Sequence, residues 1–188
     1  MNRSTEAVFD EYLVLAAQSG SSDAFGRLAA RWTPRLRRHA ALVLRDSDAA
    51  SDAVQEAWIG IARGLRRLDD PTRFPAWAFG ITTRKCVDEV RRRQRRRALT
   101  SSVTHEEAVA PGGGLRPADP DQTLDLSDAL AALPIDQRLM VGLFYGEGLA
   151  VDEVAEALGI PTGTVKSRLH AIRLSLKTLL QGEDHVPA

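Results

Sequence analysis

The sequence predicts an all-α protein made of two small helical domains joined by a flexible linker, with a helix-turn-helix in the C-terminal domain. Apolar residues recur at helical spacing in nearly every periodic stretch, and no strong alternation with period two is seen. Segment 98–122 contains three prolines and three consecutive glycines, with few residues that could be buried. Such a composition is typical of a tether, so we expect an N-terminal domain over 1–97 and a C-terminal domain over 123–188.

Three helices are predicted in the N-terminal domain. The first follows the capping residues Ser21–Asp23, and Pro34 within it predicts a kink or a break. The second is capped by Asp46–Asp48, runs to about Leu68 and carries an apolar stripe. The third is expected over about 76–97, apolar in its first part and cationic at its end. A chain of 188 residues is long enough to bury cores formed by such stripes.

Four more helical segments are predicted after the linker. Their approximate bounds are 124–133, 135–145, 151–158 and 162–180. The last two have the spacing of a helix-turn-helix. In that motif Ala155 lets the helices approach, Gly159 turns the chain and Val165 closes the small core.

The second helix of such a motif presents its N-terminal half to the major groove of DNA. Hydroxyl groups at the helix start suit phosphate oxygens, and Arg or Lys side chains can reach guanine edges. The polar residues in question are Thr162, Thr164, Lys166, Ser167, Arg168, His170 and Arg173. A plain helical hairpin with a solvated charged face is the simpler alternative.

The charges are balanced overall but unevenly distributed. The chain has 25 basic and 25 acidic residues, yet segment 81–100 carries eight basic residues against two acidic ones. Six of the eight are arginines within the run RRRQRRR at 91–97. This run predicts phosphate binding with salt-dependent affinity, while a solvated helix end stabilised by the helix dipole is the alternative.

Aromatic residues lie just before the cationic segment. Phe74, Trp77 and Phe79 could form a platform for unpaired bases. We favour the protein core for Trp77, because it shares helical spacing with Ile81.

A second polar surface is acidic. Asp48, Asp52, Gln55 and Glu56 lie at helical spacing, with Trp58 beside them. Such a face could bind a basic partner protein or could simply be solvated, and the pattern alone leaves both interpretations open.

Several functional classes are not indicated. Cys86 is the only cysteine, which excludes an intrachain disulfide, and the four histidines are too scattered to suggest a metal site. The sequence has no glycine-rich phosphate loop and no nucleophile with a general base, so we expect a binding protein without a cofactor rather than an enzyme. Without a signal peptide or a long apolar run, we expect a cytoplasmic protein that does not insert into a membrane.

Two long stretches resemble a bacterial RNA polymerase sigma factor of the extracytoplasmic-function class, in the sigma-70 family. DAASDAVQEAWIGIARGLRRL followed by FPAWAFGITTRKCVDEVRRRQRRR is similar to the family's second conserved region. LPIDQRLMVGLFYGEGLAVDEVAEALGIPTGTVKSRLHAIRLSL is similar to its fourth region. The resemblance covers nearly the whole chain. It implies a sigma factor that binds core RNA polymerase and directs initiation at promoters with minus-ten and minus-thirty-five elements.

The resemblance also implies roles for individual residues. Contact with core polymerase is implied for Asp48, Asp52, Gln55 and Glu56. Contact with the minus-ten element is implied for the loop 69–75 and the helix segment 81–92, namely Arg73, Phe74, Arg84, Lys85, Asp88, Arg91 and Arg92. The minus-thirty-five element would be read by the seven helix-turn-helix residues named above. An anti-sigma factor is a further implied partner.

One position departs from the family pattern, because Arg84 stands where the family commonly has Asn. A long cation there predicts an unusual minus-ten preference or a phosphate contact.

Two other functions remain alternatives. A dimeric helix-turn-helix regulator would bind a duplex operator without polymerase, and a protein adaptor would show no salt-dependent affinity for DNA.

Overall fold

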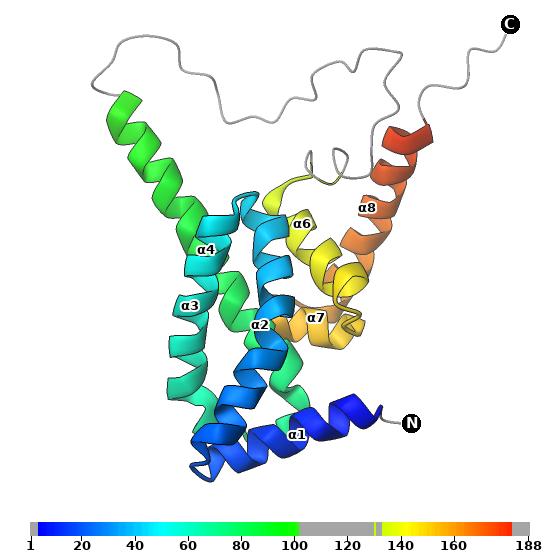
Figure 1. Ribbon diagram of the computed structural model, residues 1–188. Coiled ribbons are helices and arrows are strands. Elements are labelled where there is room, and N and C mark those ends of the chain that lie inside the picture. The colour runs from blue at the N-terminus through cyan, green and yellow to red at the C-terminus, as the bar shows by residue number, and fades with distance from the viewer. Residues whose placement is uncertain (1–3, 102–129, 131–132, 182–188) are drawn as a thin grey trace, which may run out of the picture.

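The computed structural model describes residues 4–101, 130 and 133–181, and all regular structure in these ranges is helical (Figure 1). The predicted all-α class is therefore confirmed. The elements are α1 (Thr5–Gln18), α2 (Ser22–Leu44), α3 (Ser47–Gly64), η1 (Leu65–Arg67), η2 (Pro71–Arg73), α4 (Phe74–Ser101), α6 (Ile135–Val141), η3 (Gly142–Gly146), α7 (Val151–Leu158) and α8 (Thr162–Gln181). We call α1–α4 the N-terminal module and α6–α8 the C-terminal module.

The N-terminal module contains one helix that the periodicity did not predict, α1, and one that is longer than expected, α4. α1 buries Leu13 and Val14 against α2. α2 begins where predicted, since the Ser21 side chain accepts a hydrogen bond from the Ala24 N–H at 3.2 Å. No break occurs at Pro34: α2 continues through it as one helix, with buried Trp32 and Leu36 on either side.

α3 and α4 pack closely because small residues line their contact. Asp46 caps α3 as predicted, and its carboxylate accepts from the backbone N–H groups of Asp48 and Ala49, both at 3.0 Å. A Cβ atom on Gly64 would lie 2.8 Å from the Trp77 ring, so only glycine permits this approach. Trp77 packs against the core, which confirms the assignment favoured from its spacing.

The predicted helix-turn-helix is confirmed. Gly159 has φ +66°, the left-handed conformation that ends α7, and the Ile160 N–H donates to the Ala155 carbonyl at 3.1 Å. Val165 is fully buried between the two helices. The segment predicted over 135–145 forms α6 and the π-helical turn η3. The helix predicted at 124–133 falls largely outside the described residues, as does the linker from 102 onward.

The two modules share one hydrophobic core. α7 packs on α4, and α6 and η3 pack on α2 (Figure 1). Glycine allows the backbones to meet from both sides: a Cβ atom on Gly80 would lie 3.0 Å from the Ala157 carbonyl oxygen, and one on Gly142 would lie 3.2 Å from His39 Nδ1. The C-terminal end of α4 projects beyond the other helices.

Candidate nucleic-acid interface

The acidic face predicted on α3 is solvent-exposed. Its four members, Asp48, Asp52, Gln55 and Glu56, are all exposed. Glu56 also forms an ion pair with Lys85 of α4 at 3.2 Å. Asp52 and Glu56 line a shallow cleft together with Lys85, Arg92 and Arg95, so the acidic face of α3 borders the cationic face of α4.

The loop before α4 is fixed from both ends. The Asp70 carboxylate accepts from the Thr72 N–H at 2.9 Å and thereby caps η2. Phe74 is only 1% exposed, and its ring meets that of Trp32 edge-on with centroids 5.2 Å apart. The structure thus places Phe74 in the core and not at a surface that DNA can reach. Arg73 is exposed, but its guanidinium is bound by Glu156 of α7.

The structure divides the remaining minus-ten candidates between two sides of α4. Arg84, Asp88 and Arg91 line a cleft toward the C-terminal module. Lys85 and Arg92 line the opposite cleft toward α3, and Asp88 lies at the border of both. Adjacent residues of one helix therefore face different neighbours.

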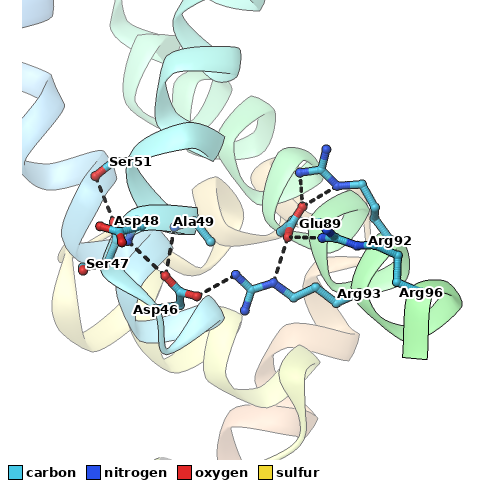
Figure 2. Close-up of polar contacts among 9 residues, drawn as sticks. All are labelled: Asp46, Ser47, Asp48, Ala49, Ser51, Glu89, Arg92, Arg93 and Arg96. Carbon is cyan, nitrogen blue, oxygen red and sulfur yellow. Dashed lines mark hydrogen bonds and ion pairs between the residues drawn. The ribbon is translucent and has the colours of Figure 1, made fainter. Parts of the chain in front are cut away.

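Glu89 organises half of the arginine run, and the sequence reasoning did not identify it. Its carboxylate, on a residue that is 8% exposed, accepts from Arg92 Nε at 2.6 Å and from Arg93 Nε at 2.8 Å (Figure 2). It also pairs with Arg96 at 3.5 Å. Arg93 reaches further to Asp46 at 2.8 Å and so ties α4 to the N-terminus of α3 (Figure 2).

Hydrogen bonds to the ionised forms stabilise the carboxylates of Glu89 and Asp46. The bond from Arg93, followed by that from Arg92, lowers the pKa of Glu89. The pKa of Asp46 is lowered first by the Ala49 backbone N–H and then by Arg93. The positions of the three arginines, three, four and seven residues after Glu89, are a helical signal that could have identified this cluster.

The arginine run is therefore not uniform. Glu89 binds Arg92, Arg93 and Arg96, whereas Arg91, Arg95 and Arg97 form no ion pair with any other described residue. The second group leaves its positive charge available to an anion from outside, and the first group is already neutralised in part.

The polar residues predicted on α8 share its outer side. Val165, Leu169 and Ile172 face the core. Six of the seven candidates are exposed, and Thr164 is half-buried. The Ser167 hydroxyl donates to the Thr164 carbonyl at 3.1 Å, and Arg173 Nε donates to the Tyr145 hydroxyl.

Other kinds of site find little support in the described part of the chain. There, no group of three or more His, Cys, Asp or Glu side chains is arranged to hold a metal ion. None of the helices in these ranges has the length and apolar character needed to span a membrane. Cys86 is buried, and desolvation raises the pKa of its thiol to about 12, so it is not a reactive cysteine.

Comparison with known proteins matches both modules to one family. Residues 28–96 match the family model described as Sigma-70 region 2, and residues 123–176 match Sigma-70, region 4. The ECF RNA polymerase sigma factor SigM of Mycobacterium tuberculosis (strain ATCC 25618 / H37Rv) is 32% identical over 171 residues, which cover 91% of this chain and 84% of SigM. The ECF RNA polymerase sigma-E factor of Escherichia coli (strain K12) is 30% identical over 189 residues, with 94% and 97% covered.

Two solved structures share the fold over most of the chain. The structure of CnrH in complex with the cytosolic domain of CnrY gives a TM-score of 0.68 at 26% identity, with 94% of this chain and 99% of CnrH covered. The sigma factor RpoE from Bartonella quintana, in complex with the anti-sigma factor NepR, gives 0.65 at 28% identity, with 86% and 98% covered. The chain therefore belongs to the extracytoplasmic-function sigma factors of bacterial RNA polymerase, in the sigma-70 family.

Proposed function

We propose that this sigma factor binds core polymerase through the acidic face of α3, contacts the minus-ten element through α4 and the loop before it, and contacts the minus-thirty-five element through α8. It supplies recognition and no chemistry of its own, and it acts in the cytoplasm. The observation that carries the proposal is the placement of three separate polar surfaces, one acidic and two basic or hydroxyl-rich, on rigid helices of one chain.

The acidic face suits a protein partner better than DNA. Asp52, Gln55 and Glu56 are exposed on consecutive turns of α3, whose position is fixed by the Asp46 cap. Phosphates would be repelled by these carboxylates, while a basic helical surface would be attracted. Within this family the expected partner is the clamp-helix coiled coil of the largest polymerase subunit.

The cationic face of α4 suits the minus-ten element. Arg91 and Arg95 are exposed and form no ion pair with the described residues, so they can bind phosphates without first losing a carboxylate partner. Arg84 is exposed too, and its length suits a phosphate contact better than the reading of a flipped base. Phe74 supports the loop from the core.

α8 suits the minus-thirty-five element as the recognition helix of the helix-turn-helix. Lys166 and Arg168 lie on its exposed side one turn from its start, where the motif meets base edges. Thr162 and Thr164 are at the helix N-terminus, where hydroxyl and backbone N–H groups favour phosphate oxygens.

An anti-sigma factor is the regulatory partner that we propose. The solved relatives CnrH and RpoE were each obtained with a bound protein, the cytosolic domain of CnrY and the anti-sigma factor NepR respectively. Likeness over most of the chain supports a comparable partner here.

The test is co-elution of the purified chain with bacterial core polymerase on a sizing column. We expect stoichiometric co-elution of the wild type. Charge reversal by Asp52→Arg, or by Gln55→Lys with Glu56→Lys, should abolish it without loss of helicity, because these side chains are exposed. Asp23→Lys reverses an exposed charge on α2 and serves as the matched control. If the folded wild type failed to bind polymerase but bound a duplex operator as a dimer, the conventional regulator would replace the sigma factor.

A further inference from the structure

A hydrogen bond joins the last of the α8 candidates to a tyrosine outside the predicted site. Arg173 Nε donates to the Tyr145 hydroxyl at 2.5 Å, and the guanidinium carbon lies 5.9 Å from the centre of the tyrosine ring. Both residues are exposed, Tyr145 to 51%. A cation this close to an aromatic ring is attracted to the ring as well as to the hydroxyl. Tyr145 therefore restricts the directions in which the Arg173 side chain can point.

The π-helical turn η3 holds Tyr145 in this position. The Glu147 N–H donates at 2.9 Å to the carbonyl of Gly142, five residues earlier, which is the bond that defines such a turn. Leu143 is fully buried, and the Phe144 ring meets the Tyr145 ring edge-on with centroids 4.9 Å apart. The turn is thus anchored in the core while its tyrosine extends to α8.

The charge of Arg173 is available to an anion from outside. α8 contains no acidic residue, and Arg173 forms no ion pair with a carboxylate of the described residues. Glu147 is near Tyr145 in the sequence, but its carboxylate is 4% exposed and binds Arg35 at 2.9 Å. Because Tyr145 engages Nε, the four N–H donors of the two Nη groups remain for a phosphate, which they can bind in parallel. The tyrosine hydroxyl keeps its own proton and can donate to the same phosphate.

The position of Arg173 along α8 favours the DNA backbone over the bases. It lies about three turns after Thr162, where α8 begins, or about 16 Å along the helix axis. A recognition helix contacts base edges with its N-terminal part, and its C-terminal end contacts the backbone. Lys166 lies two turns before Arg173 on the same side of α8, so the pair follows the base-reading part of the helix.

We propose that Tyr145 is a positioning residue that aims Arg173 at a DNA phosphate beside the minus-thirty-five element, so that the two residues form a phosphate clamp. The clamp rests on the proposed function, because α8 is the helix assigned to that element. Arg173 adds affinity for DNA of any sequence and does not read a base. Tyr145 acts through Arg173, since its hydroxyl fixes the guanidinium before DNA arrives and so reduces the conformational freedom lost on binding.

A double-mutant cycle of Tyr145→Phe and Arg173→Ala tests the clamp. The measurement is holoenzyme affinity for promoter duplexes selected with the wild type, at several salt concentrations, with and without base changes in the minus-thirty-five element. Arg173→Ala should weaken binding to all duplexes by the same factor and lower the slope of log affinity against log salt by about 0.9, because one phosphate contact is lost. Tyr145→Phe should weaken binding about threefold to tenfold in the wild type and leave it almost unchanged in Arg173→Ala.

Tyr12→Phe is the matched control. It removes the hydroxyl of an exposed tyrosine on α1 and should bind DNA like the wild type. The thermal unfolding midpoint of Tyr145→Phe should also equal that of the wild type, because both partners of the hydrogen bond are exposed. A loss of DNA affinity without a loss of stability separates the clamp from a bond that only ties η3 to α8.

Three results would overturn the clamp: wild-type affinity in Tyr145→Phe, an equal loss from Tyr145→Phe with and without Arg173, or an altered base preference in Arg173→Ala. Lys166→Ala is measured in parallel to distinguish this failure from that of the proposed function. If Lys166→Ala weakens binding while the Tyr145 and Arg173 variants do not, only the clamp fails. If none of these variants changes the affinity, the assignment of α8 to the minus-thirty-five element fails with it.

Discussion

The two surfaces assigned to DNA differ in how they are presented. On α8, Lys166, Arg168 and His170 are exposed and form no ion pair with a described residue. On the N-terminal module, Arg73 is bound by Glu156, and the α4 face that carries Arg84 and Arg91 lies against the C-terminal module. Arg84, Arg91 and Arg168 are all exposed and line one cleft, so the two surfaces differ in that Arg73 already holds a carboxylate partner.

This difference shows that a count of basic residues does not measure the capacity to bind DNA. α4 carries more arginines than α8, but part of the positive charge on the N-terminal module is engaged by Glu89 and Glu156. Whether an arginine is available to DNA depends on which carboxylates the fold brings close to it. These carboxylates come from distant positions in the sequence as well as from the same helix. Three changes should weaken the contrast between the two surfaces or define it more closely.

Acid should lower the free energy of unfolding through His39, which is buried on α2 beside Gly142, and this is the largest effect we expect. Burial lowers the pKa of His39 to about 4, so the folded state binds a proton less readily than the unfolded chain. Stability is fully present above the ordinary histidine pKa near 6.5 and falls as the pH drops toward 4. At 1.36 kcal/mol per pKa unit, the free energy of unfolding should fall by about 3 kcal/mol over this window.

Thermal unfolding between pH 7 and pH 4.5 measures this loss. The exposed His170 provides the control, since His170→Gln should keep the slope while His39→Gln should flatten it. Glu89 and Asp46, whose pKa values are lowered, begin to lose stability only near the ordinary carboxyl values at the acid end of this range, and their contribution is the same in both histidine variants. An unchanged slope in His39→Gln would remove His39 from this role.

Arg168→Ala tests the comparison on α8. If Arg168 reads a base edge, its loss should cost about 1–3 kcal/mol of binding to the minus-thirty-five element. The measurement is holoenzyme affinity for promoter duplexes selected with the wild type, with and without base changes in that element. An unchanged preference would exclude Arg168 from base reading.

Glu89→Gln should produce the smallest effect, on the face of α4 toward α3. Removal of one negative charge frees part of the positive charge of Arg92, Arg93 and Arg96. The slope of log affinity against log salt for holoenzyme on promoter DNA should steepen by about 0.9 for each additional phosphate that these arginines neutralise. Glu6→Gln, on the first turn of α1, is the control. Equal slopes for both variants would mean that the Glu89 cluster only fixes the end of α4.

Much of this architecture could be predicted because it depends on neighbours in the sequence. The Asp46 and Ser21 caps, the left-handed Gly159 and the buried Val165 all follow from residues within one or two turns. The exposed face of α3 and the outer side of α8 follow from helical periodicity in the same way.

The features that the sequence did not predict depend on contacts between distant positions. The prediction of two tethered domains gave no indication that Gly80 meets Ala157 or that Glu156 binds Arg73. Phe74 was assigned to DNA by its place in the family motif, but in the folded chain Trp32 lies against it. α1 was missed because its apolar residues lie only partly on one face: Leu13 is buried while Leu15 is 52% exposed.

In the free chain α6 packs on α2 and α7 on α4, so the distance between α2 and α8 must increase if core polymerase separates the modules to reach two promoter elements. Energy transfer between fluorophores on Ser22→Cys in α2 and Ser175→Cys in α8 measures this most directly, because the native Cys86 is buried and does not react with the dyes. We predict high transfer in the free chain and a large decrease when core polymerase is added in stoichiometric amount. Unchanged transfer in a holoenzyme verified by co-elution would contradict the separation of the modules on polymerase.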